Sequence, residues 1–260
     1  MKKIVLFAFL CITSFCLGNI NVSDPISLSL GESIINSTGV ENLSIPKYKS
    51  IYLSFGSHLL SKELKGGRGD FSLSNHYINS KFSFSGYGYK HYNYFQFSVL
   101  VSKNISQNLA IGAIIELNSF YHLGIEKRKY QLLPGLGISY QHSKKRFYSQ
   151  LIWENPLFIV RKNYFYHFEN SLLSLGLNLV ISAQTRATFE IDWINQSEII
   201  GKCGFLYSYK LFDVRCGIKF PSFHPTIGTG FEKGKFRIDL AAHYLHPLGI
   251  NLTLGVGYKF

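Results

Sequence analysis

The feature that most constrains this chain is a period-two alternation of apolar and polar residues that recurs along most of its length. It is clearest at the C-terminus, where one face is apolar and aromatic: Ile250, Leu252, Leu254, Val256, Tyr258 and Phe260. Such alternation indicates β-strands, because successive side chains of a strand point to opposite faces. Counted back from the C-terminus, it predicts eleven strands, near residues 250–260, 235–245, 225–233, 212–220, 199–210, 186–195, 168–183, 147–161, 130–142, 108–121 and 92–103.

Alternation alone fits a soluble sandwich as well as a membrane barrel, so further features must decide. The polar faces are rich in Gly, Ser and Asn, and charged residues make up only 16% of the chain, against about 25% in soluble proteins. Several strands have ten or more residues, which suits a tilted membrane crossing. Aromatic residues gather at strand ends, for example Tyr140 with Phe147 and Tyr209 with Phe212. Together these features predict an all-β, antiparallel transmembrane β-barrel in the outer membrane.

The connections between the strands support this fold. Every second connection is a short polar turn, and the others tend to be longer, most clearly at 122–129 and 155–167. Outer-membrane barrels pair short periplasmic turns with longer outer loops, so the C-terminus is expected on the periplasmic side.

The barrel is expected to span residues 47–260. Residues 47–57 alternate and read as a strand, whereas 61–70 read as a polar, Gly-rich loop. Residues 71–78 and 80–88 form either two strands or one long irregular strand. We predict fourteen strands in all, with twelve as the alternative.

Residues 1–18 have the pattern of a signal peptide, with Lys2 and Lys3 before an apolar run and small residues at its end. Residues 19–46 do not alternate. Asp24 and Pro25 favour a short helix, with Asp24 as its cap and Pro25 at its first position. This segment is either a hatch inside the barrel or a periplasmic lead-in to the first strand.

The inward face is expected to carry charges of both signs on neighbouring strands. The alternation assigns ten charged residues to this lumen-facing set: Glu116, Glu190, Asp192, Lys202, Asp213, Arg215, Lys219, Arg237, Asp239 and Lys259. Buried charges must pair or stay hydrated. The set therefore describes either a polar pore that selects solutes or a salt-bridged, nearly closed lumen.

No catalytic, cofactor-binding or metal-binding pattern stands out. Ser222 and His224 lie near each other without an evident acid partner, and His243 and His246 have a spacing that places them on opposite strand faces. Arg68-Gly69-Asp70 spells an adhesion tripeptide that we attribute to chance. The sequence thus predicts a non-enzymatic protein without a cofactor.

Two cysteines, Cys203 and Cys216, remain after the signal peptide. Both are expected to face lipid on consecutive strands, about three residues out of register, and so to be free thiols; a shifted turn is the alternative that would pair them.

The formal net charge of +12 raises the question of nucleic-acid binding. The basic residues lie in turns and at alternate strand positions rather than in a basic helix, so attraction to anionic lipid headgroups explains them at least as well. The expected partners are outer-membrane lipids, the barrel-assembly machinery and a secretion-complex protein, with no nucleic acid.

Two short regions carry a family resemblance. The terminal strand, which ends in Tyr258 and Phe260, is similar to the aromatic-ended assembly signal of outer-membrane barrels. Residues 27–33 and 41–46 resemble the opening of FadL-like barrels of Bacteroidetes type, including the PorV/PorQ group. The resemblance implies fourteen strands and either uptake of hydrophobic solutes or a role beside the type IX secretion machinery.

Two functions from different classes follow. The preferred hypothesis is a structural or accessory barrel for secretion or surface assembly, because the chain is compact. The alternative is an outer-membrane channel or transporter for small or hydrophobic solutes.

Overall fold

The structure, a computed structural model, describes most of the chain from Asp24 onward. The described residues are 24–38, 40, 42–43, 49–58, 61–74, 78–89, 92–122, 128–142, 144, 146–156, 171–195, 198–245 and 249–260. The expected signal peptide, 1–18, lies outside them. Among the described residues, no helix is long and apolar enough to cross a membrane.

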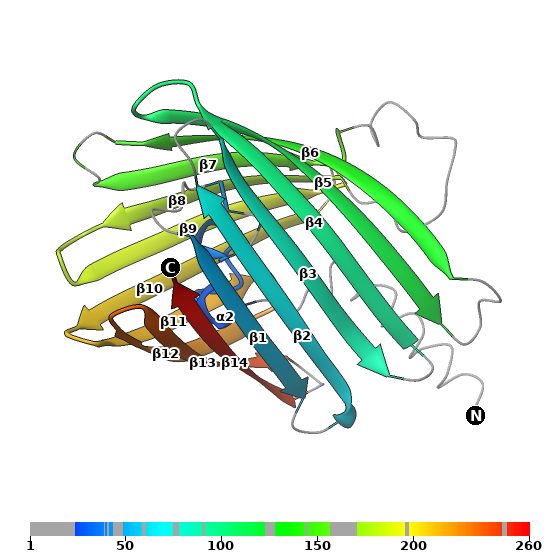
Figure 1. Cartoon of the computed structure of the whole chain (residues 1–260). Coiled ribbons are helices and arrows are strands. Elements are labelled where there is room, and N and C mark those ends of the chain that lie inside the picture. The colour runs from blue at the N-terminus through cyan, green and yellow to red at the C-terminus, as the bar shows by residue number, and fades with distance from the viewer. Residues whose placement is uncertain are drawn as a thin grey trace.

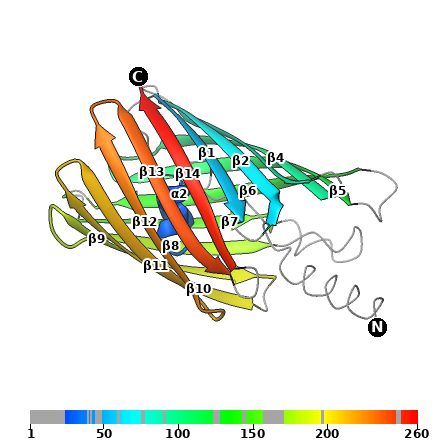
Figure 2. The ribbon, with the colours of Figure 1, turned by 90° about the horizontal axis from the view of Figure 1, so that it is seen from below.

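Within these residues, fourteen antiparallel strands form one closed barrel (Figures 1 and 2). Each strand pairs with its sequence neighbours, and the first pairs with the last, which confirms the predicted fold class and strand number. The strands are β1 (Ser50–His58), β2 (Ser61–Ser74), β3 (Asn79–Tyr89), β4 (Tyr92–Asn104), β5 (Leu109–His122), β6 (Lys129–Gln141), β7 (Phe147–Glu154), β8 (Leu172–Val180), β9 (Thr185–Ile194), β10 (Glu198–Tyr209), β11 (Phe212–Phe220), β12 (His224–Lys233), β13 (Phe236–Leu245) and β14 (Gly249–Lys259).

The barrel carries its apolar side chains on the outside. In β14, Leu254 and Val256 are exposed, whereas Thr253 and Gly255 between and beside them are buried. A soluble sandwich would bury the apolar positions instead. The outward apolar face and the closed backbone ladder are what a lipid environment requires, because lipid offers backbone groups no hydrogen bonds.

One end of the barrel carries the connections that follow the even-numbered strands β2 to β12, and each of these has at most five residues. The backbone N–H of Phe260 donates to the carbonyl oxygen of Lys49 at this same end. We call it the short-turn end, and the sequence assigns it to the periplasm. At the other end the connections from β5 to β6 and from β7 to β8 are longer, whereas the turn from β11 to β12 has only three residues.

The prediction of a loop at residues 61–70 is wrong, because these residues belong to β2. Gly67 and Gly69 sit on the outer face, where side chains of β1 cover them: Phe55 lies 3.6 Å from a Cβ built on Gly67, and Leu53 lies 3.3 Å from one on Gly69. Cross-strand cover of this kind lets glycine occupy a lipid-facing strand position. Residues 71–74 complete β2, and β3 follows as a separate strand.

The predicted strand at 147–161 is also too long. β7 ends at Glu154, and the next residue, Asn155, has a left-handed φ of 50°. A residue with positive φ interrupts the extended backbone, which explains why the strand stops there. Likewise, β8 occupies only Leu172–Val180 of the predicted 168–183.

The N-terminal segment, by which we mean the described residues between 24 and 43, contains two short helices. These are α2 (Pro25–Ser29) and the 3-10 helix η1 (Ile34–Asn36). The carboxylate of Asp24 accepts hydrogen bonds from the N–H groups of Ile26 and Ser27, and Pro25 opens α2, as predicted. α2 contacts β11, β12, β13 and β14 and lies behind β13 and β14 in Figure 2. The segment is therefore inside the barrel.

Candidate functional site

The lumen is the candidate functional site, and the ten predicted charged residues all lie on its inner face. They alternate along their strands with exposed apolar residues such as Ile191, Val214 and Ile238. Nine of them form ion pairs, and the tenth, Glu116, accepts a hydrogen bond from Asn118 at 2.6 Å.

The first ion-pair cluster joins β9 and β10. Lys202 Nζ lies 2.7 Å from Glu190 and 2.6 Å from Asp192. Glu190 is only 1% exposed. A carboxylate this deeply buried needs several donors to offset its lost hydration, and Lys202 supplies one of them.

The second cluster centres on Asp239 of β13. Its carboxylate accepts from the hydroxyl of Tyr52 at 2.8 Å, from Arg215 at 2.5 Å and from Arg237 at 2.8 Å. Tyr52 belongs to β1, so the cluster bridges the closure of the barrel. Arg215 and Asp239 are both fully buried.

From this cluster a chain of pairs continues toward the short-turn end. Arg237 reaches Asp213 at 2.6 Å and Glu232 at 2.8 Å, and Glu232 also pairs with Lys259. Because each carboxylate in the chain faces a cation, this part of the wall is close to electrically neutral.

The N-terminal segment docks on the first cluster through Glu190. The carboxylate of Glu190 accepts from the hydroxyl of Ser33 at 2.8 Å and from the N–H groups of Ile34 and Ile35 at 3.2 Å and 3.1 Å. A barrel side chain thus caps η1, whose own N-cap residue makes no side-chain cap bond. This supplies the remaining donors that the buried carboxylate requires.

Further polar contacts hold the segment to strands around the whole barrel. Each joins a residue of the segment to an inward side chain: Gly31 to Thr226, Glu32 to Lys219, Asn36 to Thr188 and Asn178, Thr38 to Asp70, Val40 to Ser83, Asn42 to Lys81, and Leu43 to Gln150. These partners belong to β2, β3, β7, β8, β9, β11 and β12. The segment therefore crosses the lumen from one wall to the other.

Lys219 fixes the charge of Glu32, a residue of the segment. Burial by itself raises the pKa of Glu32, but the nearby charges of Lys219, His243 and Lys202 more than offset it and bring the pKa to about 2. Glu32 is therefore ionised at neutral pH, and its ion pair with Lys219, at 2.7 Å, is maintained.

Glycines of the inner wall make room for the segment. A Cβ on Gly204 would lie 2.8 Å from Cβ of Leu30, and one on Gly176 would lie 3.0 Å from Cβ of Ile35. Similar close approaches occur at Gly112 and Gly137 against Leu43, at Gly217 against Leu30 and Gly31, at Gly228 against Ser29, and at Gly255 against Pro25. We call these seven glycines the glycine seats.

An apolar core forms where the end of the segment meets β4, β5 and β7. Val40 and Leu43 pack with Leu100, Ile114 and Ile152, all nearly fully buried. Such inward apolar residues depart from the polar pattern of the lumen. Their burial depends on the segment, since it supplies two of the five side chains.

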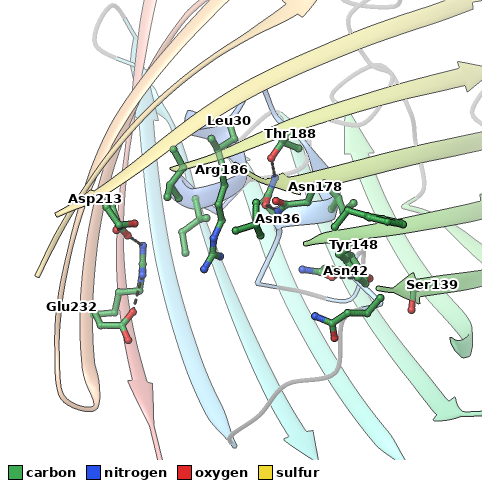
Figure 3. Close-up of a pocket in the computed structure, with 18 of the residues that line it drawn as sticks. Leu30, Asn36, Asn42, Ser139, Tyr148, Asn178, Arg186, Thr188, Asp213 and Glu232 are labelled. Carbon is green, nitrogen blue, oxygen red and sulfur yellow. Dashed lines mark hydrogen bonds and ion pairs between the residues drawn. The ribbon is translucent and has the colours of Figure 1, made fainter. Parts of the chain in front are cut away.

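A cavity of about 780 Å³ remains between the segment and the short turns, and we call it the vestibule (Figure 3). Residues of three of these connections line it, among them Asn108, Lys210 and Gly234, together with strand residues and with Leu30, Asn36 and Asn42 of the segment. Amide and hydroxyl groups are frequent in its wall, and Arg186 points into it.

Aromatic residues line the lumen toward the other end. Tyr92 makes edge-to-face contacts with Tyr87 and Phe120, with ring centroids 6.5 Å and 5.3 Å apart. The interior is therefore aromatic at the end opposite the short-turn end, whereas amide, hydroxyl, charged and apolar groups share the wall of the vestibule.

Sequence reasoning missed several lumenal residues, most of them around the segment. The glycine seats read as generic small polar-face residues, and Arg186 fell in a predicted turn. Arg68 and Asp70 belonged to a predicted loop, although they form a buried ion pair at 3.0 Å. Extending the strand alternation through 61–70 would have placed both on the inner face.

The cysteines are free and both lie on the outer face. Cys216 pairs with Phe205, and Cys203 pairs with Ile218. They are thus two positions out of register, not three, because the turn between β10 and β11 contains only Lys210 and Leu211.

The proposed assembly signal lies at the short-turn end. The ring of Tyr258 is 4.8 Å from that of Phe236 and 5.0 Å from that of Phe260, measured between centroids. This outward aromatic group suits the membrane interface.

Elsewhere, the residues considered for chemistry stand apart. Ser222 is exposed in a turn and His224 faces inward, and no hydrogen bond joins them in the described part of the chain. His243 is buried on the inner face, and His246 lies outside the described residues. Within the described ranges, no group of three or more His, Cys, Asp or Glu residues is arranged to hold a metal ion.

Comparison with known proteins gives matches at the level of structure. No protein-family model and no curated protein matches the sequence. A deltaS2 mutant of the TodX monoaromatic hydrocarbon channel superposes with a TM-score of 0.67 at 10% identity, covering 91% of this chain and 98% of that one. The Ralstonia pickettii toluene transporter TbuX gives 0.64 at 9% identity, with 91% and 98% covered. The CymD monoaromatic hydrocarbon channel gives 0.64 at 8% identity, with 92% and 97% covered.

At such low identity the likeness establishes the fold and not the solute. The narrower resemblance to the PorV/PorQ group and to type IX secretion receives no support from these matches. The chain is an outer-membrane β-barrel that shares its fold with these channels and transporters.

Proposed function

We propose that this protein is a non-enzymatic outer-membrane channel for small solutes whose passage is controlled by the N-terminal segment. The observation that carries the proposal is the way the segment is held. It crosses the lumen through side-chain hydrogen bonds, ion pairs and glycine seats, and it adds no strand to the closed ladder. The barrel wall can therefore remain intact when the segment moves.

Two further features support a channel. The vestibule leaves about 780 Å³ of space between the segment and the short-turn end. The structural neighbours are described as hydrocarbon channels and toluene transporters, a likeness that supports the proposal by analogy of fold alone.

Deletion of residues 20–43 tests the channel. The variant is expected to fold, as judged by heat-modifiable gel mobility, and to conduct in planar bilayers with a larger and steadier conductance than the full chain. A folded variant that conducts no more than the full chain would contradict the proposal.

The accessory role preferred from the sequence stays as the second candidate. Its support is the dense pairing of the lumenal charges, which suits a wall built for stability as well as one built for transport. In that case the same deletion leaves conductance unchanged and removes a periplasmic partner that co-purifies with the full chain. Outer-membrane lipids and the barrel-assembly machinery remain the partners expected under either role.

A further inference from the structure

The vestibule contains one cation, Arg186, that the described part of the wall does not neutralise. Its carboxylates, Asp213 and Glu232, are engaged by Arg237, and Glu232 also pairs with Lys259. In contrast, Arg186 has no carboxylate partner among the described residues. The Nζ atom of Lys210, which also lines the vestibule, lies over the ring of the outward-facing Tyr209 at 5.2 Å.

Figure 3 shows the difference directly. Dashed lines join the guanidinium drawn between Asp213 and Glu232 to both carboxylates, whereas the guanidinium of Arg186 extends into the cavity without one. A guanidinium presents five N–H donors in a planar fork that matches a carboxylate. The vestibule therefore presents a guanidinium that an anion can pair with.

Amides beside this cation are fixed in orientation. Asn178 Nδ2 donates to Asn36 Oδ1 at 2.8 Å, and Asn36 Nδ2 donates to Thr188 Oγ1 at 3.0 Å. Each amide has two N–H donors and an oxygen with two lone pairs, so these bonds use only part of its capacity. The Tyr148 hydroxyl, which donates to Gln150 at 3.0 Å, can still accept.

The amide and hydroxyl groups of the vestibule wall both donate and accept hydrogen bonds. They therefore suit the hydroxyl groups of a solute, which also donate and accept. The cavity volume of about 780 Å³ lies within the roughly 300–1,000 Å³ common for small-molecule sites. We propose that the vestibule binds a small organic anion rich in hydroxyl groups, of the sugar-acid class, with its carboxylate on Arg186 and its hydroxyls on Asn36, Asn178 and Tyr148.

This inference rests on the proposed function for the role of the site, as a station for a solute in transit. Its test is equilibrium binding, which needs no conduction. A protein that binds the probe but never conducts would contradict the channel function while supporting the binding site.

Three six-carbon probes separate the contribution of the carboxylate charge from that of the hydroxyl groups. They are gluconate, its neutral counterpart sorbitol, and hexanoate, an anion without hydroxyls, each titrated calorimetrically into the full chain in detergent micelles. Gluconate is expected to bind saturably, and the other two at least about tenfold more weakly, as the loss of charge-assisted or multiple hydrogen bonds implies. Equal affinity for sorbitol would overturn the role of charge, and equal affinity for hexanoate would overturn the role of the amides.

Substitution locates the site. Arg186→Gln is expected to weaken gluconate binding at least about tenfold, and Arg186→Lys, which keeps the charge, to weaken it less. Arg146→Gln is the matched control, because Arg146 is exposed in the turn between β6 and β7 and does not line the vestibule. Absence of saturable gluconate binding, or equal loss in the Arg186→Gln and Arg146→Gln variants, would overturn the proposal.

Discussion

Successive residues of one strand of this barrel meet two different environments. In β14, Leu254 is 45% exposed on the outer face, opposite Leu240 on one side and Phe55 on the other. Its neighbour Thr253 is buried on the inner face. At the residue scale, the identity of a side chain is therefore set by the face it occupies, because lipid excludes charge and the lumen tolerates it.

Leu254→Arg tests this assignment. Leu254 is at the centre of β14, so the cation would lie near the bilayer midplane and should lower the free energy of unfolding by about 2–4 kcal/mol. Ile181→Arg is the control, because Ile181 is 64% exposed in a short turn and should cost only about 0–1 kcal/mol near the interface. The measurement is urea-induced unfolding from liposomes, and equal costs at the two positions would show that Leu254 does not face the lipid core.

At the element scale, the N-terminal segment is shaped by the wall as much as by its own sequence. The helix α2 has five residues and η1 has three, lengths at which helices in water are not stable alone. The wall completes them by capping η1 through Glu190 and by leaving glycine seats for Leu30 and Ile35.

Gly204→Val tests the glycine seats. A Cβ at Gly204 would lie 2.9 Å from the carbonyl oxygen of Leu30, whereas at Gly201 on the same strand nothing lies within 4 Å. Because this contact is with a backbone atom and not with a flexible side chain, Gly204→Val should displace the segment and raise the conductance in planar bilayers. Gly201→Val should behave as the unaltered protein. Identical conductance of the two folded variants would mean that the seat at Gly204 does not hold the segment.

At the scale of the whole molecule, the barrel and its N-terminal segment form two systems with different bonding. The wall is a continuous ladder of backbone hydrogen bonds, and the segment is attached to it by side-chain contacts on opposite sides of the lumen. The weaker attachment is the one expected to open, because it can be broken without exposing backbone groups to lipid.

A reversible cross-link between segment and wall tests this division. An ideal Cβ on Gly176 lies 3.0 Å from Cβ of Ile35, about half an ångström below the lower end of the roughly 3.5–4.5 Å range of a disulfide, so a shift of that size allows the bond. In a Cys203→Ser, Cys216→Ser background, the Ile35→Cys, Gly176→Cys pair should lose channel openings on oxidation and recover them on reduction. The Ile35→Cys single variant serves as the control, and openings that persist in the oxidised pair would exclude control by the segment.

The amino-acid sequence predicted the barrel and the positions of its last eleven strands, the faces of Glu190, Lys202, Arg237 and Asp239, and the cap of α2 by Asp24, because strand alternation and helix capping are local. Residues 61–70 were wrongly predicted to be a loop because they are rich in glycine. Gly67 and Gly69 fit a strand because side chains of β1 cover them, and the local sequence does not show this contact. Only the tertiary structure decided which groups meet. Ser33 and Glu190 are 157 residues apart and Tyr52 and Asp239 are 187 apart, and their meeting depends on how the closed sheet sets the register of every strand. The path of the segment, the glycine seats and the cation left free in the vestibule follow from that closure, which no local pattern encodes.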